Sequence, residues 1–309
     1  MSIIVSSNIN NKFWNTTHHG FVDSVVKNIG EHRFLLMFMD DGTGFNLNGL
    51  PSKVETSVID NTLITHSKHA NLKSTFGFEN YACLESGEFV NFIDFDDDDI
   101  LILCDWDVVM QRGFTEKELE TFNNLGPTEF GVSKDHYHKT RDTRIYSKGN
   151  LLHGYFRMAK IYDDISEDWV IYQAGVQAAR ISAWKKLYEH WKELAPRFYE
   201  LHREHFASQG LFNYIIHKFN MVKELPPTFH LSNHSGGNSK NPKHWWPGIS
   251  AELRPGIPMD LRYKYCPSEE CEKILFDQPH FVYVNERYPK GEHEKILFNH
   301  HHWKHSPGF

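Results

Sequence analysis

Two aspartates separated by one residue follow a short apolar run in the first half of the chain. Residues 100–103 read Ile-Leu-Ile-Leu. Cys104 follows this run, and the next three residues are Asp105, Trp106 and Asp107. So short a run of branched side chains is typical of a strand buried on both faces, as in a parallel sheet. Side chains at i and i+2 of an extended chain point the same way. The two carboxylates can therefore converge at the carboxyl end of this strand.

Two converging carboxylates repel each other unless a cation lies between them. Hard divalent ions prefer oxygen ligands, and they are commonly held by one or two carboxylates together with substrate phosphates. Open α/β sheets bind ligands at the carboxyl ends of their strands. We therefore expect Asp105 and Asp107 to hold Mn2+ (or Mg2+) against a diphosphate. The alternative is a pair of solvated turn aspartates.

Elements that could position these carboxylates alternate between strand and helix. A strand is expected at residues 2–7, a helix at 19–29 and a second strand at 33–39, which form a parallel β-α-β unit. A capping box of Thr115 and Glu118 predicts a helix start. Further helices are expected at 70–84, 115–122, 183–194 and 208–219, and further strands at 58–64, 100–103, within 151–162, around 169–181 and at 295–298. The pattern predicts an α/β fold with a mostly parallel central sheet flanked by helices.

Two details of this pattern concern element ends. Pro196 is expected to stop the helix at 183–194. The four acids at 96–99 precede the central strand, and a charge run in such a place is expected to be a solvated turn. Cys104 lies in the presumed strand and is expected to be a reduced core thiol.

Length and composition limit the class of protein. The chain has 309 residues, of which 40% are hydrophobic and 24% charged, enough for one large α/β domain or two small ones. The net charge of −7 argues against a general nucleic-acid partner. No stretch approaches the roughly 20 apolar residues of a transmembrane segment, and no signal peptide precedes the first strand. A cytoplasmic protein is expected.

Three further motifs follow the Asp-Trp-Asp triplet. They are Tyr-Gln-Ala-Gly-Val-Gln-Ala-Ala-Arg at 172–180, Ser-Gln-Gly-Leu-Phe-Asn at 208–213, and a His-rich end with a lysine at 300–304. In this order the chain resembles the GT-A nucleotide-sugar glycosyltransferases, and its layout is similar to glycosyltransferase family eight. The resemblance spans roughly residues 3–305 and consists of layout and short motifs.

The resemblance implies a single GT-A-like domain over 1–309. A Rossmann-like half at about 1–110 would bind the nucleotide sugar, and a half at about 111–309 would bind the acceptor and end in a lid or metal segment. The implied function is metal-dependent transfer of a sugar from a UDP- or GDP-sugar to a glycan or glycoprotein hydroxyl.

The resemblance also assigns the metal and phosphate contacts. Asp105 and Asp107 match the DxD motif that holds the metal, and Asp105 would also contact the donor. His300 or His302 would supply a third metal ligand, with Lys304 as a phosphate clamp. The alternative for these last residues is an exposed tail, because the family's usual His-x-x-Gly-x-x-Lys spacing is absent.

Other residues match substrate-binding positions of the family. Gln173 and Gly175 match its Asn-x-Gly segment, and Gln209 and Asn213 match a helix start in which Ser208 replaces the usual Asp. The amides among these residues could instead be buried groups satisfied by backbone.

Strand ends and one loop supply the remaining candidates. Ser6 and Asn8 at the end of the first strand, and Asp40 at the end of the second, could hold the nucleoside base. Trp245 and Trp246, in the loop 232–250, suit stacking on sugar faces, or else pack the loop onto the body.

The reaction itself stays open at this point. An inverting transfer needs a general base, for which Asp168 and Glu167 are candidates, whereas a retaining transfer does not. A nucleotidyltransferase is an alternative, although residues 8–12 lack the glycines of a triphosphate-binding loop. A non-catalytic carbohydrate-binding module is the third possibility.

Overall fold

The structure is a computed structural model, and it describes the chain in segments. The described residues are 1–10, 14, 20–40, 44–60, 86–106, 108–134, 164–165, 169–170, 172–201, 207–226, 228–232 and 297–300. The strands are β1 (Ile3–Asn10), β2 (Arg33–Asp40), β3 (Val54–Asp60), β4 (Ile100–Cys104), β5 (Val108–Met110), β6 (Phe130–Lys134), β7 (Tyr172–Arg180), β8 (Val222–Glu224), β9 (His230–Ser232) and β10 (Phe298–His300). The helices are α2 (Gly20–Asn28), the short 3-10 helix η2 (Glu88–Asn91), α5 (Glu116–Asn123), α7 (Ile181–Leu201) and α8 (Ala207–Lys218).

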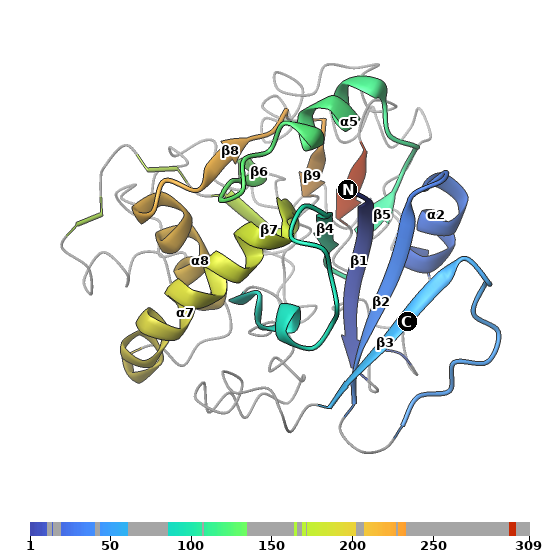
Figure 1. Ribbon diagram of the computed structural model, residues 1–309, viewed down its shortest axis with the longest axis horizontal. Coiled ribbons are helices and arrows are strands. Elements are labelled where there is room, and N and C mark those ends of the chain that lie inside the picture. The colour runs from blue at the N-terminus through green and yellow to red at the C-terminus, as the bar shows by residue number, and fades with distance from the viewer. Residues whose placement is uncertain are drawn as a thin grey trace, which may run out of the picture.

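A mixed sheet of seven strands forms the centre of the molecule, in the order β3-β2-β1-β4-β7-β6-β8 (Figure 1). The first four strands in this order are parallel neighbours, as the sequence predicted. The strand β7 runs antiparallel to both β4 and β6. Among the described strands of this sheet, β7 alone is reversed, so the prediction of a mostly parallel sheet is confirmed.

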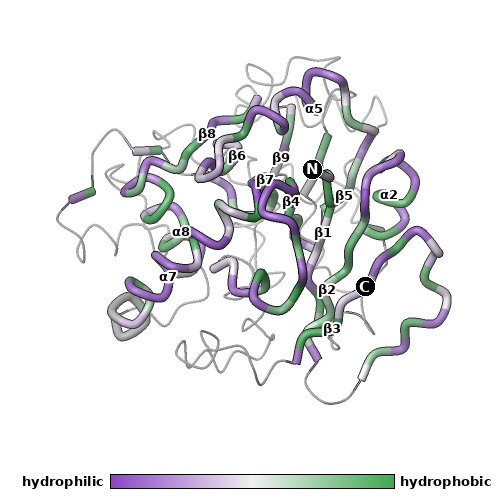
Figure 2. Tube along the Cα trace, in the orientation of Figure 1, coloured by the Kyte–Doolittle hydropathy of each residue, from purple (hydrophilic) through white to green (hydrophobic). Residues whose placement is uncertain are grey.

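Both faces of the sheet are buried, which explains the unbroken apolar runs. In β2, Leu35, Met37 and Met39 pack with residues of η2, α7 and α8 on one face. Phe34, Leu36 and Phe38 pack with α2 and the strands β5 and β10 on the other. Alternate side chains of a strand point to opposite faces, so a strand covered on both sides is apolar at every position. Figure 2 shows β2 as a continuous hydrophobic stretch.

A second, three-stranded sheet has the order β5-β10-β9. The helix α2 holds the β5 edge of this sheet through the backbone of one residue, Met110. Asn28 Nδ2 donates to the Met110 carbonyl at 2.7 Å, and the Met110 N–H donates to Ser24 Oγ at 3.1 Å. Because Ser24 and Asn28 are four residues apart on one helix face, they fix β5 against the central sheet.

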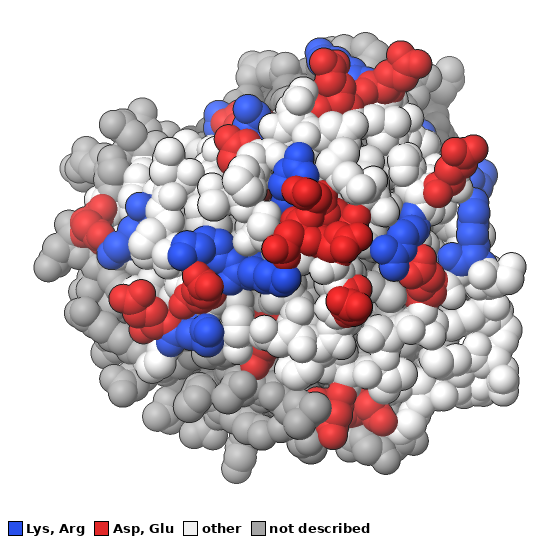
Figure 3. Space-filling view, in the orientation of Figure 1, with Lys and Arg blue, Asp and Glu red and all other residues white. Residues whose placement is uncertain are grey.

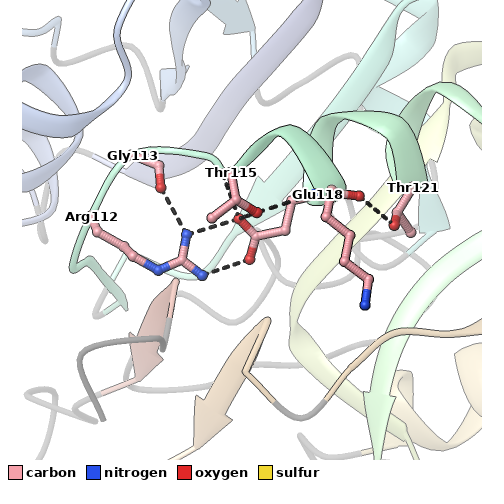
Figure 4. Close-up of polar contacts among 6 residues, drawn as sticks. Arg112, Gly113, Thr115, Glu118 and Thr121 are labelled. Carbon is pink, nitrogen blue, oxygen red and sulfur yellow. Dashed lines mark hydrogen bonds and ion pairs between the residues drawn. The ribbon is translucent and has the colours of Figure 1, made fainter. Parts of the chain in front are cut away.

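The capping box predicted at the start of α5 is present, and Arg112 completes it (Figure 4). The Glu118 N–H donates to Thr115 Oγ1 at 3.3 Å, and the Thr115 N–H donates to Glu118 Oε2 at 2.9 Å. Arg112 donates to both carboxylate oxygens of Glu118, at 2.8 and 2.6 Å. Burial raises the pKa of Glu118, but the bonds from Arg112 and Thr115 outweigh it, and the net pKa is lowered.

The acid run at 96–99 is not simply a solvated turn. Asp99 is buried and accepts a 2.6 Å hydrogen bond from the Ser2 N–H. Asp97 pairs with Lys185 at 2.6 Å, and Asp98 pairs with Arg180 at 3.3 Å. Figure 3 shows a cluster of acidic side chains with basic ones around it on the face that carries the N-terminus. These acids tie the amino end of β4 to its neighbours, at the opposite end of the strand from Asp105.

Several predicted boundaries shift. The helix expected to end before Pro196 continues to Leu201, because a proline removes only its own N–H bond and helices can kink and continue. The strand expected at 58–64 lies at Val54–Asp60, and the last strand lies at Phe298–His300 rather than 295–298. The predicted helix at 70–84 and the strand within 151–162 fall outside the described residues. None of the described helices combines the length and apolar character needed to cross a bilayer.

Candidate functional site

The site lies where β1, β2 and β4 end. In register, Ser6 pairs with Leu103 and Ser7 pairs with Cys104, so Asn8 and Asp105 are the next residues of two neighbouring parallel strands. The strand β1 continues beyond the end of β4, and Asn10 pairs with Met39 of β2. Because parallel strands present their carboxyl ends at one edge of a sheet, polar groups of β1, β2 and β4 meet here.

The residue between the two aspartates anchors the end of β4. Trp106 is buried, and its ring lies 5.8 Å from Trp14 and 5.7 Å from Phe21, in the core on the α2 face of the sheet. Asp105 comes two residues after Leu103, so the alternation of β4 directs it to the other face, where Leu101 and Leu103 lie. The chain then turns at Trp106, where the Val108 N–H donates to the Asp105 carbonyl at 3.1 Å, so the extended chain expected after Asp105 is not formed. The Asp105 residue is half-buried.

The sulfur next to this carboxylate is inert. Cys104 is buried and free of disulfides, as expected. Burial, and then the negative charge of Asp105, raise the pKa of the Cys104 thiol well above its usual range. The thiol therefore stays protonated and acts as a small core group, and the chemistry of this edge belongs to oxygen ligands.

Regular antiparallel pairing with β4 brings Gly175 of β7 to Asp105, at a point where the pairing of β7 with β6 is irregular. On the β6 side, Val132 pairs with Gln177 and Lys134 pairs with Tyr172, so two steps along β6 correspond to five along β7. On the β4 side, the Asp105 N–H donates to the Gly175 carbonyl at 2.8 Å. Bulges often occur next to active sites, where they redirect the chain. The structure thus brings together Asp105 and Gly175, two residues that the sequence assigned to one site.

The end of β1 carries buried polar side chains that the fold does not satisfy. Ser6 and Ser7 are fully buried and Asn8 is 5% exposed. The Ser6 and Ser7 hydroxyls and both polar atoms of the Asn8 amide have no hydrogen-bond partner in the described part of the chain. Buried polar groups are almost always paired in a folded protein, so this set makes the end of β1 a candidate contact for a polar ligand. Ser7 was missed from the sequence, although three polar residues at the end of a doubly covered strand are a visible signal.

The small sheet brings the C-terminal His-rich segment to the same edge. The strand β10 pairs antiparallel with β5, with His300 opposite Val108, the residue that follows Asp107. The backbone of His300 is described, whereas Asp107 lies outside the described residues. The register therefore places His300, one of the two histidines proposed as metal ligands, opposite the residue that follows the motif.

The donor set at this edge suits a hard divalent cation. Carboxylates with an imidazole are ligands that Mn2+ and Mg2+ accept, and Asp105 is held half-buried by the bond to Gly175 and by the packing of Trp106. Among the residues whose side chains are described, no three His, Cys, Asp or Glu side chains gather into a metal-binding group. Of the predicted ligands, Asp107 and His302 lie outside the described residues and the side chain of His300 is not described, so this ligand set stays a prediction.

The amides of α8 contact backbone. Asn213 is fully buried, its Oδ1 accepts from the Tyr172 N–H at 2.7 Å, and its Nδ2 donates to the Tyr172 carbonyl at 2.9 Å. Gln209 Nε2 donates to the same carbonyl at 3.2 Å. Gln173 is buried one residue further along β7. Asn213 thus acts on the site by holding the start of β7, three residues before Gly175.

Asp40, the last residue of β2, is half-buried, and its Oδ1 accepts from the Gly44 N–H at 3.1 Å. Its register partner is Asp60 of β3, so it lies one strand further from Asp105 than Asn8 does. The remaining predicted site residues lie outside the described residues, or in the case of Ser208 have no described side chain: Asp107, Glu167, Asp168, Ser208, Trp245, Trp246, His302 and Lys304.

Comparisons with known proteins bear on the fold. No protein-family model matches the sequence, and no curated protein matches it significantly. The structure is similar to that of mouse xyloside xylosyltransferase 1 without ligands, with a TM-score of 0.52 and 13% identity over 98% of each chain. It is also similar to the bifunctional glycosyltransferase WbbM without ligands, with a TM-score of 0.53 and 12% identity over 97% of this chain and 46% of that one.

A third similar structure is the galactosyltransferase LgtC in complex with donor and acceptor sugar analogues. Its TM-score is 0.50, and the identity is 13% over 95% of this chain and 100% of LgtC. At such identities the similarity concerns the fold. The α/β fold of GT-A type, expected from the order of the sequence motifs, is therefore confirmed.

Proposed function

We propose that this chain transfers a sugar from a nucleoside diphosphate sugar, with UDP or GDP as the leaving group, to a hydroxyl of a glycan or glycoprotein. The observation that carries the proposal is the meeting of three chain segments at one sheet edge. Asn8 lies near the end of β1, Asp105 follows β4, and His300 in β10 lies opposite the residue after Asp107. The similarity of the fold to three glycosyltransferases supports this reading.

In this proposal the unpaired polar groups of β1 bind the nucleoside. The amide of Asn8 has one donor and one acceptor group, which matches the edge of a pyrimidine or purine base. Ser6 lies two residues earlier on the same face of the strand. Burial of both side chains keeps water away from these bonds, so each discriminates strongly between a matching base edge and a mismatched one.

Asp105, Asp107 and His300 or His302 would hold the divalent cation. A cation bound there neutralises the negative charge that develops on the leaving diphosphate. Lys304 would contact the diphosphate, and Gln173 and the backbone at Gly175 would contact the sugar. The base of an inverting reaction would come from Asp168 or Glu167, and the anomeric configuration of the product, read by NMR, decides whether such a base is used.

A thermal-shift panel of nucleotide sugars with and without Mn2+ tests the proposal. A UDP- or GDP-sugar should raise the melting temperature by mass action in the presence of Mn2+, and Asp107→Ala should abolish the shift. Asp97→Asn is the matched control, because Asp97 is an exposed acid paired with Lys185 at the other end of the sheet. Stabilisation by a glycan alone, without metal, would indicate a carbohydrate-binding module. Stabilisation by nucleoside triphosphates alone would indicate a nucleotidyltransferase.

A further inference from the structure

One face of α8 is attached to the chain that leads into β7. Gln209, Asn213 and His217 are spaced four residues apart, so they form one row along the helix. Gln209 and Asn213 bind the backbone of Tyr172, as described above. His217 Nε2 lies 2.7 Å from the carbonyl oxygen of Val170. The row therefore binds the backbone of two residues, Val170 and Tyr172, just before and at the start of β7.

His217 contributes both a donor and a flat surface. A carbonyl oxygen can only accept, so Nε2 of His217 carries the hydrogen. Burial lowers the pKa of His217 against the opposing effect of the Val170 carbonyl, which keeps the imidazole neutral near pH 7. The ring stacks on Trp169, with centroids 4.9 Å apart and planes at 9°, and its centroid lies 5.4 Å from that of Tyr172.

A second row of the same helix extends these attachments. Tyr214 donates from its hydroxyl to Asp164 Oδ1 at 2.8 Å. Lys218, one turn further, donates to the Tyr214 hydroxyl at 2.7 Å and pairs with Asp164 Oδ2 at 3.0 Å. Contacts from α8 therefore hold residues 164, 169, 170 and 172. Lys218, at the end of the helix, contacts Asp164, and Gln209, near its start, contacts Tyr172.

These attachments end three residues from the candidate site. Tyr172 is the first residue of β7, and the bulge between Tyr172 and Gln177 carries the Gly175 carbonyl that accepts from the Asp105 N–H. The pairing of β7 with β6 is interrupted between Tyr172 and Gln177, so the position of this segment depends on what fixes its two ends. Ladder pairing with β4 fixes the far end as far as the Asp105–Gly175 bond, whereas the Lys134–Tyr172 pair and the bonds from α8 fix the near end.

We infer that His217 and the Gln209–Asn213–His217 row of α8 are positioning residues for the donor site, because they fix the near end of the β7 bulge and so hold Gly175 against Asp105. The effect on sugar transfer rests on the proposed function. The chain of contacts from His217 to the Asp105 amide does not rest on the proposed function, because all of these contacts lie within the protein itself.

Hydrogen exchange of the Asp105 amide measures this link directly. His217→Phe retains an aromatic ring beside Trp169 but removes the donor to Val170. We expect about tenfold faster exchange of the Asp105 amide in this variant. The matched control is Ser182→Ala, which removes a 3.0 Å side-chain bond to the Pro127 carbonyl just beyond the other end of β7. In that variant the Asp105 amide should exchange at the wild-type rate.

Two further measurements separate positioning from general damage. His217→Gln restores an N–H donor of similar reach, and it should return the exchange rate most of the way to wild type. In transfer assays, His217→Phe should lower kcat/KM for the nucleotide sugar about tenfold and leave the KM for the acceptor unchanged. Should His217→Phe fail to fold, Lys218→Met, at the half-exposed end of the second row, is measured in the same way.

The outcomes distinguish this inference from the proposed function. Unchanged Asp105 exchange in His217→Phe, or equal acceleration in Ser182→Ala, overturns the positioning role whatever the activity. Faster exchange in His217→Phe alone supports it, even if no nucleotide sugar is used. A wild-type protein that neither binds nor transfers any nucleotide sugar overturns the proposed function and leaves the exchange result standing.

Discussion

His300 lies opposite Val108 in the antiparallel pair of β10 and β5, so a residue near the C-terminus is adjacent to the end of the Asp-Trp-Asp motif. The helix α2 fixes this arrangement through Ser24 and Asn28, which bind the N–H and the carbonyl of Met110. The pairing is independent of any ligand. The third metal ligand, if it is His300, is therefore provided by a sheet rather than by a free tail.

This arrangement predicts that His300→Ala weakens Mn2+-dependent binding of the nucleotide sugar by about tenfold or more, the range seen when the shell of a metal site is damaged. Isothermal titration with and without Mn2+ gives the affinities. His32→Gln serves as control, because His32 packs edge-on against Phe114 at the amino end of β2, away from the site. An unchanged affinity in His300→Ala would remove His300 from the ligand set and leave His302.

The Arg112–Glu118 pair predicts a dependence of stability on acid pH. The pKa of Glu118 is lowered from 4.5 in the folded protein. The pair therefore stabilises the fold fully above pH 4.5, and this contribution is lost as the pH falls through the lower, folded pKa. Glu118→Gln should reduce the free energy of unfolding at pH 7 by about 1–2 kcal/mol. It should also flatten the decrease below pH 4.5.

Urea unfolding at pH 7 and at a series of acid pH values provides the measurement. Glu116→Gln is the matched variant, because it removes an exposed carboxylate from the same helical turn without breaking the contacts of Arg112. If the free energy of unfolding falls equally steeply with decreasing pH below 4.5 in wild type and in Glu118→Gln, the ion pair makes no contribution to stability that depends on pH.

Gly87, the residue before η2, has no room for a side chain. Its φ is 75°, and a Cβ added there would lie 2.9 Å from the Trp184 carbonyl oxygen of α7. Gly30 has a similar φ of 66° but no atom within 4 Å of an added Cβ. Gly30→Ala should lower the free energy of unfolding by about 1 kcal/mol through backbone strain. Gly87→Ala should lower it by a further ~1–3 kcal/mol through overpacking.

Thermal or urea unfolding of both variants supplies the comparison, and the difference between them isolates the contact with α7. If the two variants were equally stable, η2 and α7 could separate at little cost, and the close packing of Phe89 on Trp184, with ring centroids 5.2 Å apart, would not constrain them.

The sequence was most informative where local pattern and burial agree. The apolar run of β4 and the capping box of α5 each occupy a few consecutive residues, and the structure places both as predicted. The strand β1 was predicted at residues 2–7 but extends to Asn10, so Asn8 lies within it. Local signals suffice here because a doubly covered strand needs apolar side chains at every position, and a helix start needs a side-chain acceptor.

The features that the sequence did not predict depend on distant partners. The strands β5 and β9 have three residues each and no periodicity of their own, and they are strands because both pair with β10. Asp99 looked like a solvated acid but is buried against the N-terminal chain. The spacing of Gln209, Asn213 and His217 was visible in the sequence, whereas the backbone that they bind was not.

Asn8→Leu should make the protein more stable and less able to bind its nucleotide. Leucine has a similar size and no polar atoms, so it removes the desolvation penalty of a buried amide without a described partner. We expect the free energy of unfolding to rise by about 1 kcal/mol, and nucleotide affinity to fall at least about tenfold, or ~1.4 kcal/mol. Ser133→Ala, at a fully buried hydroxyl likewise without a described partner, is the control and should keep full affinity. A loss of stability in Asn8→Leu would mean that the fold itself satisfies this amide, and the nucleoside contact would then have to be sought elsewhere along this sheet edge.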